Sequence, residues 1–240
     1  VNYYYSLIFK RTYKIVGTKV AEATKIYENI FRSVNIALVN ELKVIFNTMD
    51  IDIWKVIKAA KTKPFGFMPF YPGPGLGGHC IPIDPFYLSW KVKEYGLHTE
   101  FIELAGRINS EMPNYILSRL IETATTKGIK LKSLRVLMLG IAYKKNINDS
   151  RESPSIKIIE LLNKLKVKVD YHDPLIRSVF ISRSKKLSSI TFNKKNLKNY
   201  NCILLTTDHD DVNYKYLNEF DGFILDTRNK LKESSNIIKT

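Results

Sequence analysis

The sequence has few cysteines, no long apolar run and no glycine-rich dinucleotide motif, and each absence excludes a class of protein. Only two of its 240 residues are cysteine, Cys80 and Cys202, so a disulfide framework is not expected. No run of about 18 uninterrupted apolar residues exists, and the first residues lack the charged leader and small-residue cleavage site of a secretory signal. The sequence therefore predicts a soluble, cytoplasmic protein.

Negative charge is also in short supply, because 38 Lys and Arg face 23 Asp and Glu, for a formal net charge of +15. Such an excess can attract nucleic acid or phosphorylated small molecules, or can reflect a lysine-biased proteome. Lysines are spread along the chain without a nucleic-acid recognition motif. We therefore expect no nucleic acid, no membrane and no metal as partners, and a nucleic-acid-binding protein is the least favoured alternative.

Helical periodicity fills the first half of the chain. Between residues 21 and 47 it predicts one long helix with a buried apolar stripe, formed by Ile26, Ile30, Val34, Ala37, Leu38, Leu42 and Ile45. Further helices are expected at about 52–61, from Asp84 to Gly96, and at about 100–127. Asp84 would cap its helix ahead of Pro85, and Pro113 would kink or break the last helix before Gly128 stops it.

The periodicity changes after Gly128. Short apolar runs, RVLMLG, VKVDYHD, SSITF, CILLTT and FILDT, alternate with amphipathic stretches such as SPSIKIIELLNKL. This alternation is typical of a parallel sheet with crossover helices. The predicted fold class is α/β, with an all-helical central domain followed by a doubly wound, Rossmann-like parallel-sheet domain over 133–240.

The first predicted strand leads into LGIAYKKNINDSRESPS, without the GxGxxG turn of a dinucleotide site. A phosphate would instead be held by Lys144, Lys145 and Arg151, beside a helix capped by Ser153 with Pro154 at its first position. The alternative is an ordinary loop with solvated lysines.

The loop GPGLGGHCIPIDPF, at residues 73–86, places Cys80 after four glycines. A nucleophilic thiol needs exposure and a neighbour that lowers or uses its pKa, and His79, Asp84 and the start of the next helix supply such neighbours. Two plainer interpretations remain open, because His79 can bond a loop carbonyl and Asp84 can act only as a helix cap.

Three segments carry a family resemblance. GPGLGGHCIPIDPFYLSW resembles the active-cysteine segment of the UDP-glucose/GDP-mannose dehydrogenase family, ENIFRSVNIALVNEL at 28–42 resembles its central helix, and GIAYKKNINDSRESPS at 140–155 resembles the start of its UDP-binding domain. The His-Cys variant is most similar to the UDP-N-acetylglucosamine 6-dehydrogenases within that family.

The resemblance implies oxidation of a UDP-sugar C6 hydroxyl to a carboxylate with two NAD⁺, in the synthesis of polysaccharide precursors. Cys80 would form a thiohemiacetal and then a thioester, which water hydrolyses. Lys25 and Asn29 match the residues that stabilise the oxyanion, and Asp84 matches the acid that assists a water. The spacing of Lys25 and Asn29 agrees with this role, because residues i and i+4 share a helical face.

The resemblance also implies contacts to substrate and cofactor. The expected substrate-binding residues are Tyr71, Gly73, Gly75, Gly77, Tyr143, Lys144 and Arg228. Arg151 and Cys80 match residues that reach the cofactor, NAD. A homodimer through the central helix, 21–47, is the expected assembly.

The sequence departs from the family at its beginning. Residues 1–20 resemble only the last helix and strand of the NAD-binding domain, so we expect a fragment with domains at 1–20, 21–128 and 129–240 that is inactive or nearly so on its own. The alternative is a noncatalytic UDP-sugar-binding and dimerisation module. The arginine that some relatives lend from a neighbouring subunit has no clear match, and Lys61 or Lys63 would have to replace it.

Overall fold

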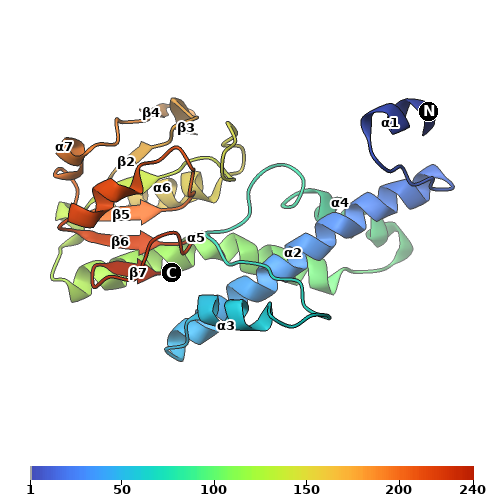
Figure 1. The fold of residues 1–240 in the computed structure, drawn as a ribbon, viewed down its shortest axis with the longest axis horizontal. Coiled ribbons are helices and arrows are strands. Elements are labelled where there is room, and N and C mark those ends of the chain that lie inside the picture. The colour runs from blue at the N-terminus through green and yellow to red at the C-terminus, as the bar shows by residue number, and fades with distance from the viewer. Residues whose placement is uncertain (1) are drawn as a thin grey trace.

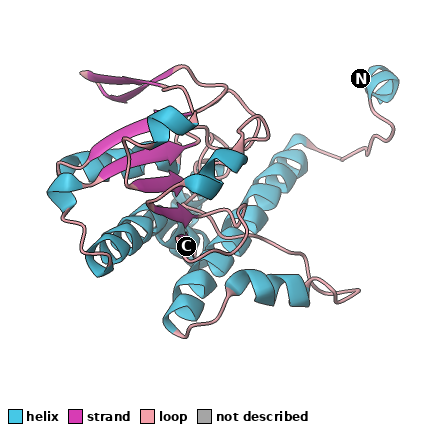
Figure 2. Cartoon of the chain, turned by 60° about the vertical axis from the view of Figure 1, so that its left-hand side comes forward, coloured by secondary structure: helices cyan, strands magenta, loops and turns pink. Residues whose placement is uncertain are grey.

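The chain divides into a helical half and a half built around a sheet (Figure 1). The computed structural model describes residues 2–240. The first half contains α1 (Asn2–Ile8), α2 (Thr18–Thr48), α3 (Ile53–Ala60), α4 (Asp84–Lys91), the 3-10 helix η1 (Val92–Tyr95) and α5 (Glu100–Thr126). Helix α1 lies beyond the N-terminal end of α2, on the side away from the sheet in both ribbon views (Figures 1 and 2).

The second half contains a five-stranded parallel sheet in the order β2-β1-β5-β6-β7. Its strands are β1 (Arg135–Leu139), β2 (Lys168–His172), β5 (Cys202–Leu205), β6 (Phe223–Asp226) and β7 (Ile237–Lys239). An antiparallel hairpin of β3 (Ser178–Ser182) and β4 (Lys185–Ser188) stands apart from it. The helices are α6 (Pro154–Lys164), α7 (Lys194–Leu197) and the 3-10 helices η2 (Leu131–Ser133) and η3 (Tyr214–Glu219).

Both faces of the parallel sheet are covered, which confirms the doubly wound prediction. Val136 and Met138 of β1 belong to a core shared with α5 and α6, whereas Leu137 and Leu139 belong to a second core with α7 and η3. Alternate residues of a strand point to opposite faces, so a strand covered on both sides is apolar throughout. Because α5 also runs along α2, this helix joins the two halves of the chain.

The inward face of α2 is largely polar, which corrects the predicted apolar stripe. Its buried residues are Asn29, Ser33, Ala37, Val39, Asn40 and Lys43. Of the predicted stripe only Ala37 is buried, and Leu38 and Ile45 are exposed. Burial of amides and hydroxyls is tolerated on this face because hydrogen bonds satisfy them.

Two buried asparagines connect α2, α5 and the glycine loop. Asn40 accepts a hydrogen bond from the Gly73 N–H at 3.0 Å and donates to Asn109 Oδ1 at 2.9 Å. Asn109 in turn donates to the Ser33 carbonyl at 3.1 Å. We call this set, Ser33, Asn40, Gly73 and Asn109, the amide relay. It fixes the start of the glycine loop against two helices by buried groups.

A buried lysine links α2 to the edge of the sheet. Lys43 is 5% exposed, and its Nζ donates to the Lys239 carbonyl of β7 at 3.2 Å. Burial is the main cause that lowers the pKa of Lys43, to about 8, although the nearby Asp52 and Asp226 carboxylates act in the opposite direction. The contact between α2 and the sheet therefore includes a poorly solvated cation.

Local signals for helix ends agree with the structure. Asp52 accepts a hydrogen bond from the Trp54 N–H as the cap of α3, and Ser153 does the same for Ser155 at the start of α6. Gly96 and Gly128, which follow η1 and α5, have positive φ angles of 70° and 71°.

Other expectations are corrected. Helix α5 continues through Pro113, because a proline within a helix removes one hydrogen bond without ending it when tertiary packing holds both turns. Asp84 is the first residue of α4 rather than its cap, a position taken by Ile83. The strand expected at 188–192 is replaced by β4, which ends at Ser188, and residues 9–17 contain no strand.

Substitution Asn109→Ala tests the amide relay. It leaves the Asn40 amide and the Ser33 carbonyl buried without their partner, so we expect the free energy of unfolding to fall by about 1–3 kcal/mol. Denaturant unfolding measures this change. Asn114→Ala is the matched control, because Asn114 is exposed on the same helix and bonds only Glu111 at the surface. Equal losses in the two variants would contradict the role of the relay.

Candidate active site

The glycine loop packs against the sheet-bearing half of the protein. A Cβ atom added to Gly77 would lie 2.5 Å from Tyr143 Cβ and 2.9 Å from the Glu152 carbonyl oxygen. The Gly78 N–H also donates to the Arg151 carbonyl at 3.1 Å. The glycines at these positions thus allow the backbone of the loop to approach the segment that follows β1 closely.

A second close approach brings the loop to the end of β6. A Cβ atom on Gly73 would lie 2.6 Å from Arg228 Nη1. Arg228 Nε donates to the Thr206 carbonyl at 2.7 Å, and burial is the main cause that lowers the pKa of its guanidinium. The structure therefore brings together Gly73, Gly77, Tyr143 and Arg228, all predicted as substrate contacts.

Cys80 is exposed at the end of this loop, in contrast to the buried Cys202. Its carbonyl accepts hydrogen bonds from the N–H groups of Ile83, at 3.3 Å, and Asp84, at 2.8 Å. The turn these bonds close leads directly into α4, which begins at Asp84. The thiol thus lies one turn before the positive end of a helix and is open to solvent, as a nucleophile requires.

Asp84 is held by α2 rather than by its own helix. Its Oδ2 accepts a hydrogen bond from Asn29 Nδ2 at 2.7 Å, and Asn29 is fully buried. The Asn29 amide oxygen accepts from the Arg32 guanidinium. The amide and the carboxylate to which the resemblance gives catalytic roles therefore touch, next to the backbone of Cys80.

Lys25 is not part of this contact. It lies one turn before Asn29 on α2, is exposed, and forms a surface ion pair with Glu28 at 3.5 Å. Such a pair contributes little free energy, so the Lys25 ammonium is free to turn to another anion.

Arg151, the predicted cofactor contact, is paired within its own loop. Its Nε and Nη2 donate to the two oxygens of Asp149 at 2.9 and 2.6 Å. These bonds, with a smaller contribution from nearby His79, lower the pKa of Asp149 to about 2. The Arg151 side chain is 64% exposed and Asp149 only 19%, so the guanidinium keeps a face open to solvent while the carboxylate is largely covered.

The predicted phosphate lysines differ in their surroundings. Lys144 is exposed, whereas Lys145 forms an ion pair with Asp210 at 2.7 Å. Tyr71 is half exposed and stacks on Trp54 of α3, with ring centroids 6.1 Å apart. Gly75, with a φ of 134°, contacts Pro154 at the start of α6.

Several residues that shape this site were missed from the sequence. They are Asn40 and Asn109 in the amide relay, Arg32 beside Asn29, Asp149 beside Arg151, and the buried pair Asp173 and His209. Asp173 directly follows β2, and His209 lies four residues after the end of β5. Polar residues at the carboxyl ends of parallel strands are a signal that could have identified them.

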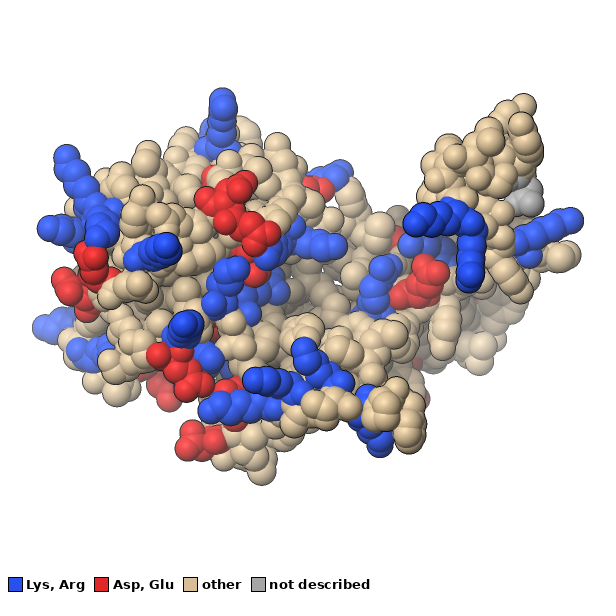
Figure 3. Space-filling view, in the orientation of Figure 1, with Lys and Arg blue, Asp and Glu red and all other residues tan. Residues whose placement is uncertain are grey.

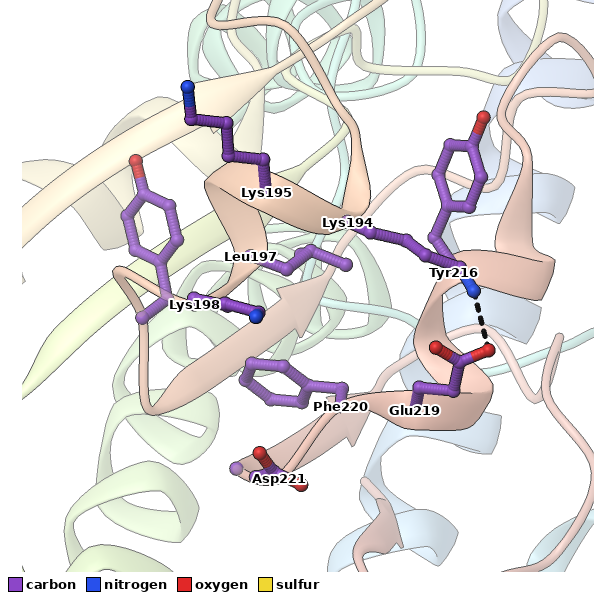
Figure 4. A pocket seen from close by; sticks show the side chains of 10 residues that line it. Lys194, Lys195, Leu197, Lys198, Tyr216, Glu219, Phe220 and Asp221 are labelled. Atoms are coloured by element: carbon purple, nitrogen blue, oxygen red, sulfur yellow. Dashed lines mark hydrogen bonds and ion pairs between the residues drawn. The ribbon is translucent and has the colours of Figure 1, made fainter.

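Cavities lie close to the glycine loop and also far from it. One of about 370 Å³ backs the loop and includes Gly75, Phe86, Asn109 and Pro154 in its lining. Another, of about 640 Å³, lies at the amino-terminal ends of β5 and β6, and none of the predicted site residues lines it (Figure 4). Three lysines surround it, and Lys194 is engaged with Glu219 at 2.5 Å.

Basic side chains on the face in Figure 3 are dispersed among acidic ones and do not form a single stripe. Within residues 2–240 no helix is long and apolar enough to cross a membrane. The same residues contain no group of three or more His, Cys, Asp or Glu placed to hold a metal ion.

Gly77→Ala tests the close packing, here called the seam, of the glycine loop against the segment after β1. The added methyl group would overlap Tyr143 and the Glu152 carbonyl, so we expect a loss of about 1–3 kcal/mol in the free energy of unfolding and faster exchange of the Gly78 amide. Gly66→Ala is the control, because Gly66 has a φ of 72° but no atom within 4 Å of an added Cβ. Faster Gly78 exchange in the control as well would refute a local seam.

Comparison with known proteins identifies the family to which the chain is similar. Models of the UDP-glucose/GDP-mannose dehydrogenase family match twice, its central domain at residues 19–111 and its UDP binding domain at residues 137–233. The UDP-N-acetyl-D-glucosamine 6-dehydrogenase of Salmonella typhi is 37% identical over 220 residues, which cover 92% of this chain and 51% of that protein. The enzyme of the same name from Pseudomonas aeruginosa is 42% identical over 173 residues, covering 72% of this chain and 40% of that protein.

A solved structure of a UDP-D-ManNAc dehydrogenase from Pyrococcus horikoshii superimposes with a TM-score of 0.75 at 30% identity, covering 88% of this chain and 48% of that one. The chain spans about half the length of the relatives it matches. Two consecutive domain models, in order and over most of the chain, show that it belongs to the UDP-glucose/GDP-mannose dehydrogenase family.

Proposed function

We propose that this chain carries the thiol-bearing and UDP-binding parts of a nucleotide-sugar 6-dehydrogenase. The observation that supports the proposal most is the placement of the exposed Cys80 between the partly buried Asn29–Asp84 contact and the loop that packs on Tyr143. The proposed substrate is UDP-N-acetylglucosamine, and the proposed product is the corresponding uronic acid for polysaccharide synthesis. Similar proteins include dehydrogenases named for UDP-N-acetyl-D-mannosamine, so the sugar is the least constrained part of the proposal.

In the proposed reaction the C6 alcohol is oxidised to an aldehyde, and the Cys80 thiolate then bonds to the aldehyde carbon to give a thiohemiacetal. A second oxidation converts it to a thioester, and a water molecule releases the acid and restores the thiol. The exposed Lys25 ammonium would donate to the oxygen on C6 as it gains charge, and Asn29, buried one turn further along α2, would assist it by holding Asp84 in place. Asp84 would hold the attacking water and accept its proton.

The proposed cofactor is NAD, which when bound accepts a hydride from C6 in each oxidation. The residue of this chain that fits it is Arg151, because its guanidinium is exposed beside the single carboxylate of Asp149 and can exchange that partner for a phosphate. Cys80 would lie next to the nicotinamide. Each step at C6 leaves the sugar held by contacts to Tyr71, Gly73, Gly75, Gly77, Tyr143, Lys144 and Arg228.

A second candidate function is a noncatalytic UDP-sugar-binding module, which the match of residues 137–233 to the family's UDP binding domain supports. An absorbance assay for NADH with NAD⁺ and UDP-N-acetylglucosamine separates the two. NADH release that disappears in Cys80→Ser supports the enzyme, and UDP binding without NADH supports the module.

Calorimetry with UDP tests the part that both candidates share. We expect Lys144→Ala to weaken UDP binding about tenfold, since a lost charge-assisted hydrogen bond to phosphate costs about 1.4 kcal/mol or more. Lys164→Ala, an exposed lysine on α6, is the matched control and should leave the affinity unchanged. No binding of UDP by the wild-type chain would refute the proposed function.

We also propose that the chain forms a homodimer through α2. The outward face of this helix carries exposed apolar side chains at heptad-like spacing, Tyr27, Phe31, Leu38 and Ile45. A groove of about 470 Å³ between α2 and α5 continues this face at Ile45. A helix that is polar inside and apolar outside needs a partner for its outer face.

Sedimentation equilibrium of Leu38→Glu tests the dimer. A charge in the centre of the apolar face should shift the population from dimer to monomer, because it would be buried unpaired. Leu165→Glu, at a residue that is also exposed but lies after α6, is the control and should remain dimeric. A wild-type chain that is monomeric at every concentration would exclude this assembly.

A further inference from the structure

A buried aspartate accepts hydrogen bonds from several backbone N–H groups at the carboxyl end of the sheet. Asp173, which follows β2, is 3% exposed, and its Oδ2 accepts hydrogen bonds from the N–H groups of Ile141, at 2.8 Å, and Ala142, at 3.0 Å. Its Oδ1 accepts from the N–H groups of Leu175 and Ile176. Burial alone would raise the pKa of Asp173, but the bonds from His209 and the backbone lower it to about 2. The carboxylate is therefore charged and fully engaged.

His209, which lies after β5, contacts both Asp173 and the segment that follows β1. It is 1% exposed, and its Nε2 lies 3.1 Å from Asp173 Oδ2. Its Nδ1 accepts a hydrogen bond from the Asn146 N–H at 3.0 Å. Because Nδ1 acts as an acceptor, the neutral ring carries its hydrogen on Nε2 and donates it to Asp173.

The pair holds both ends of a five-residue span that contains two predicted substrate contacts. Ala142 is fixed by Asp173 and Asn146 is fixed by His209, and Tyr143 and Lys144 lie between them. The Ala142 carbonyl is held as well, because Thr207 Oγ1 donates to it at 2.6 Å. Tyr143 in turn contacts Gly77 and Gly78 of the loop that leads to Cys80.

Within its own loop the span is held by the Tyr143 N–H, which donates to the Asp149 carbonyl at 3.0 Å. The side-chain contacts of Lys145 and Asn146 are at the surface. The side chain of Asn146 exchanges hydrogen bonds with Asp210, at 2.6 and 3.0 Å, and Lys145 pairs with the same carboxylate. Asp210 is more than half exposed, so water competes for these bonds. The buried contacts to Asp173 and His209 therefore set the position of the span.

We propose that His209, oriented by Asp173, is a positioning residue that sets where Tyr143 and Lys144 meet the diphosphate of the ligand. This inference rests on the proposed function, because it assigns a role within the same UDP site. His209 itself need not touch the ligand.

Two substitutions separate the contacts of His209. Asn at position 209 keeps an oxygen near Nδ1, which can accept from Asn146, but is too short to reach Asp173. Gln keeps a donor near Nε2 for Asp173 but leaves the Asn146 N–H without its acceptor. We expect His209→Gln to weaken UDP binding about tenfold, the effect of misplacing one charge-assisted contact, and His209→Asn to restore part of this loss.

The measurements are UDP affinity by calorimetry, hydrogen exchange of amides 141–149, and the thermal midpoint, each on the full chain. Exchange at Asn146 should rise in His209→Gln more than in His209→Asn. His172→Asn is the matched control, because His172 also lies at the end of a strand but its ring contacts the Ile190 carbonyl and Phe192. It should lower the thermal midpoint without changing UDP affinity.

The outcomes distinguish this inference from the function on which it rests. A wild-type chain that does not bind UDP overturns the proposed function. Wild-type binding together with unchanged affinity in His209→Gln, at a lowered thermal midpoint, overturns the inference alone and assigns His209 a purely structural role. Equal losses of affinity in His209→Gln and His172→Asn overturn it as well.

Discussion

The constraint on which the rest of the structure depends is the satisfaction of buried polar groups between α2, α5 and the glycine loop. The loop has no regular secondary structure, so its backbone must find partners elsewhere. Asn40 supplies one for Gly73, and Asn109 holds Asn40 in place. With its start fixed in this way, the loop can cross to Tyr143 and return to Cys80 without losing its shape.

The glycines serve this crossing as much as they serve a ligand. Sequence reasoning assigned them to close approach by a sugar nucleotide. In the structure the space beside Gly73 and Gly77 is filled by Arg228 and Tyr143, residues of the sheet-bearing half. The loop therefore helps to fix how the helical half packs against the sheet-bearing half. The position of Cys80, at the end of the loop, depends on this packing.

The sequence predicted best what depends on local pattern. The apolar runs that form β1, β2, β5 and β6 were recognised, whereas β7 was not, and the cap Ser153 was placed correctly. These features depend on the periodicity of the chain and on neighbouring residues. The face of α2 was wrong, because periodicity says which residues share a face but not which face turns inward. Whether Asn29 and Asn40 can be buried depends on Asp84 and Asn109, 55 and 69 residues away, which no local pattern reveals. For the same reason the contact between Asn29 and Asp84, both of which the resemblance implies as site residues, becomes visible only in three dimensions.

Lys43 gives the joint between the helical and sheet halves an electrostatic character of its own. With a pKa near 8 in the folded chain and an ordinary value near 10.5 when unfolded, this ammonium opposes folding wherever it must stay protonated. As pH rises from about 8 toward 10.5, the folded chain has already released this proton while the unfolded chain still holds it, so Lys43 contributes a gain in stability across that alkaline interval. The contact of α2 with β7 is therefore less costly to the folded chain in mild alkali, where the buried amine no longer carries a charge, than at neutral pH.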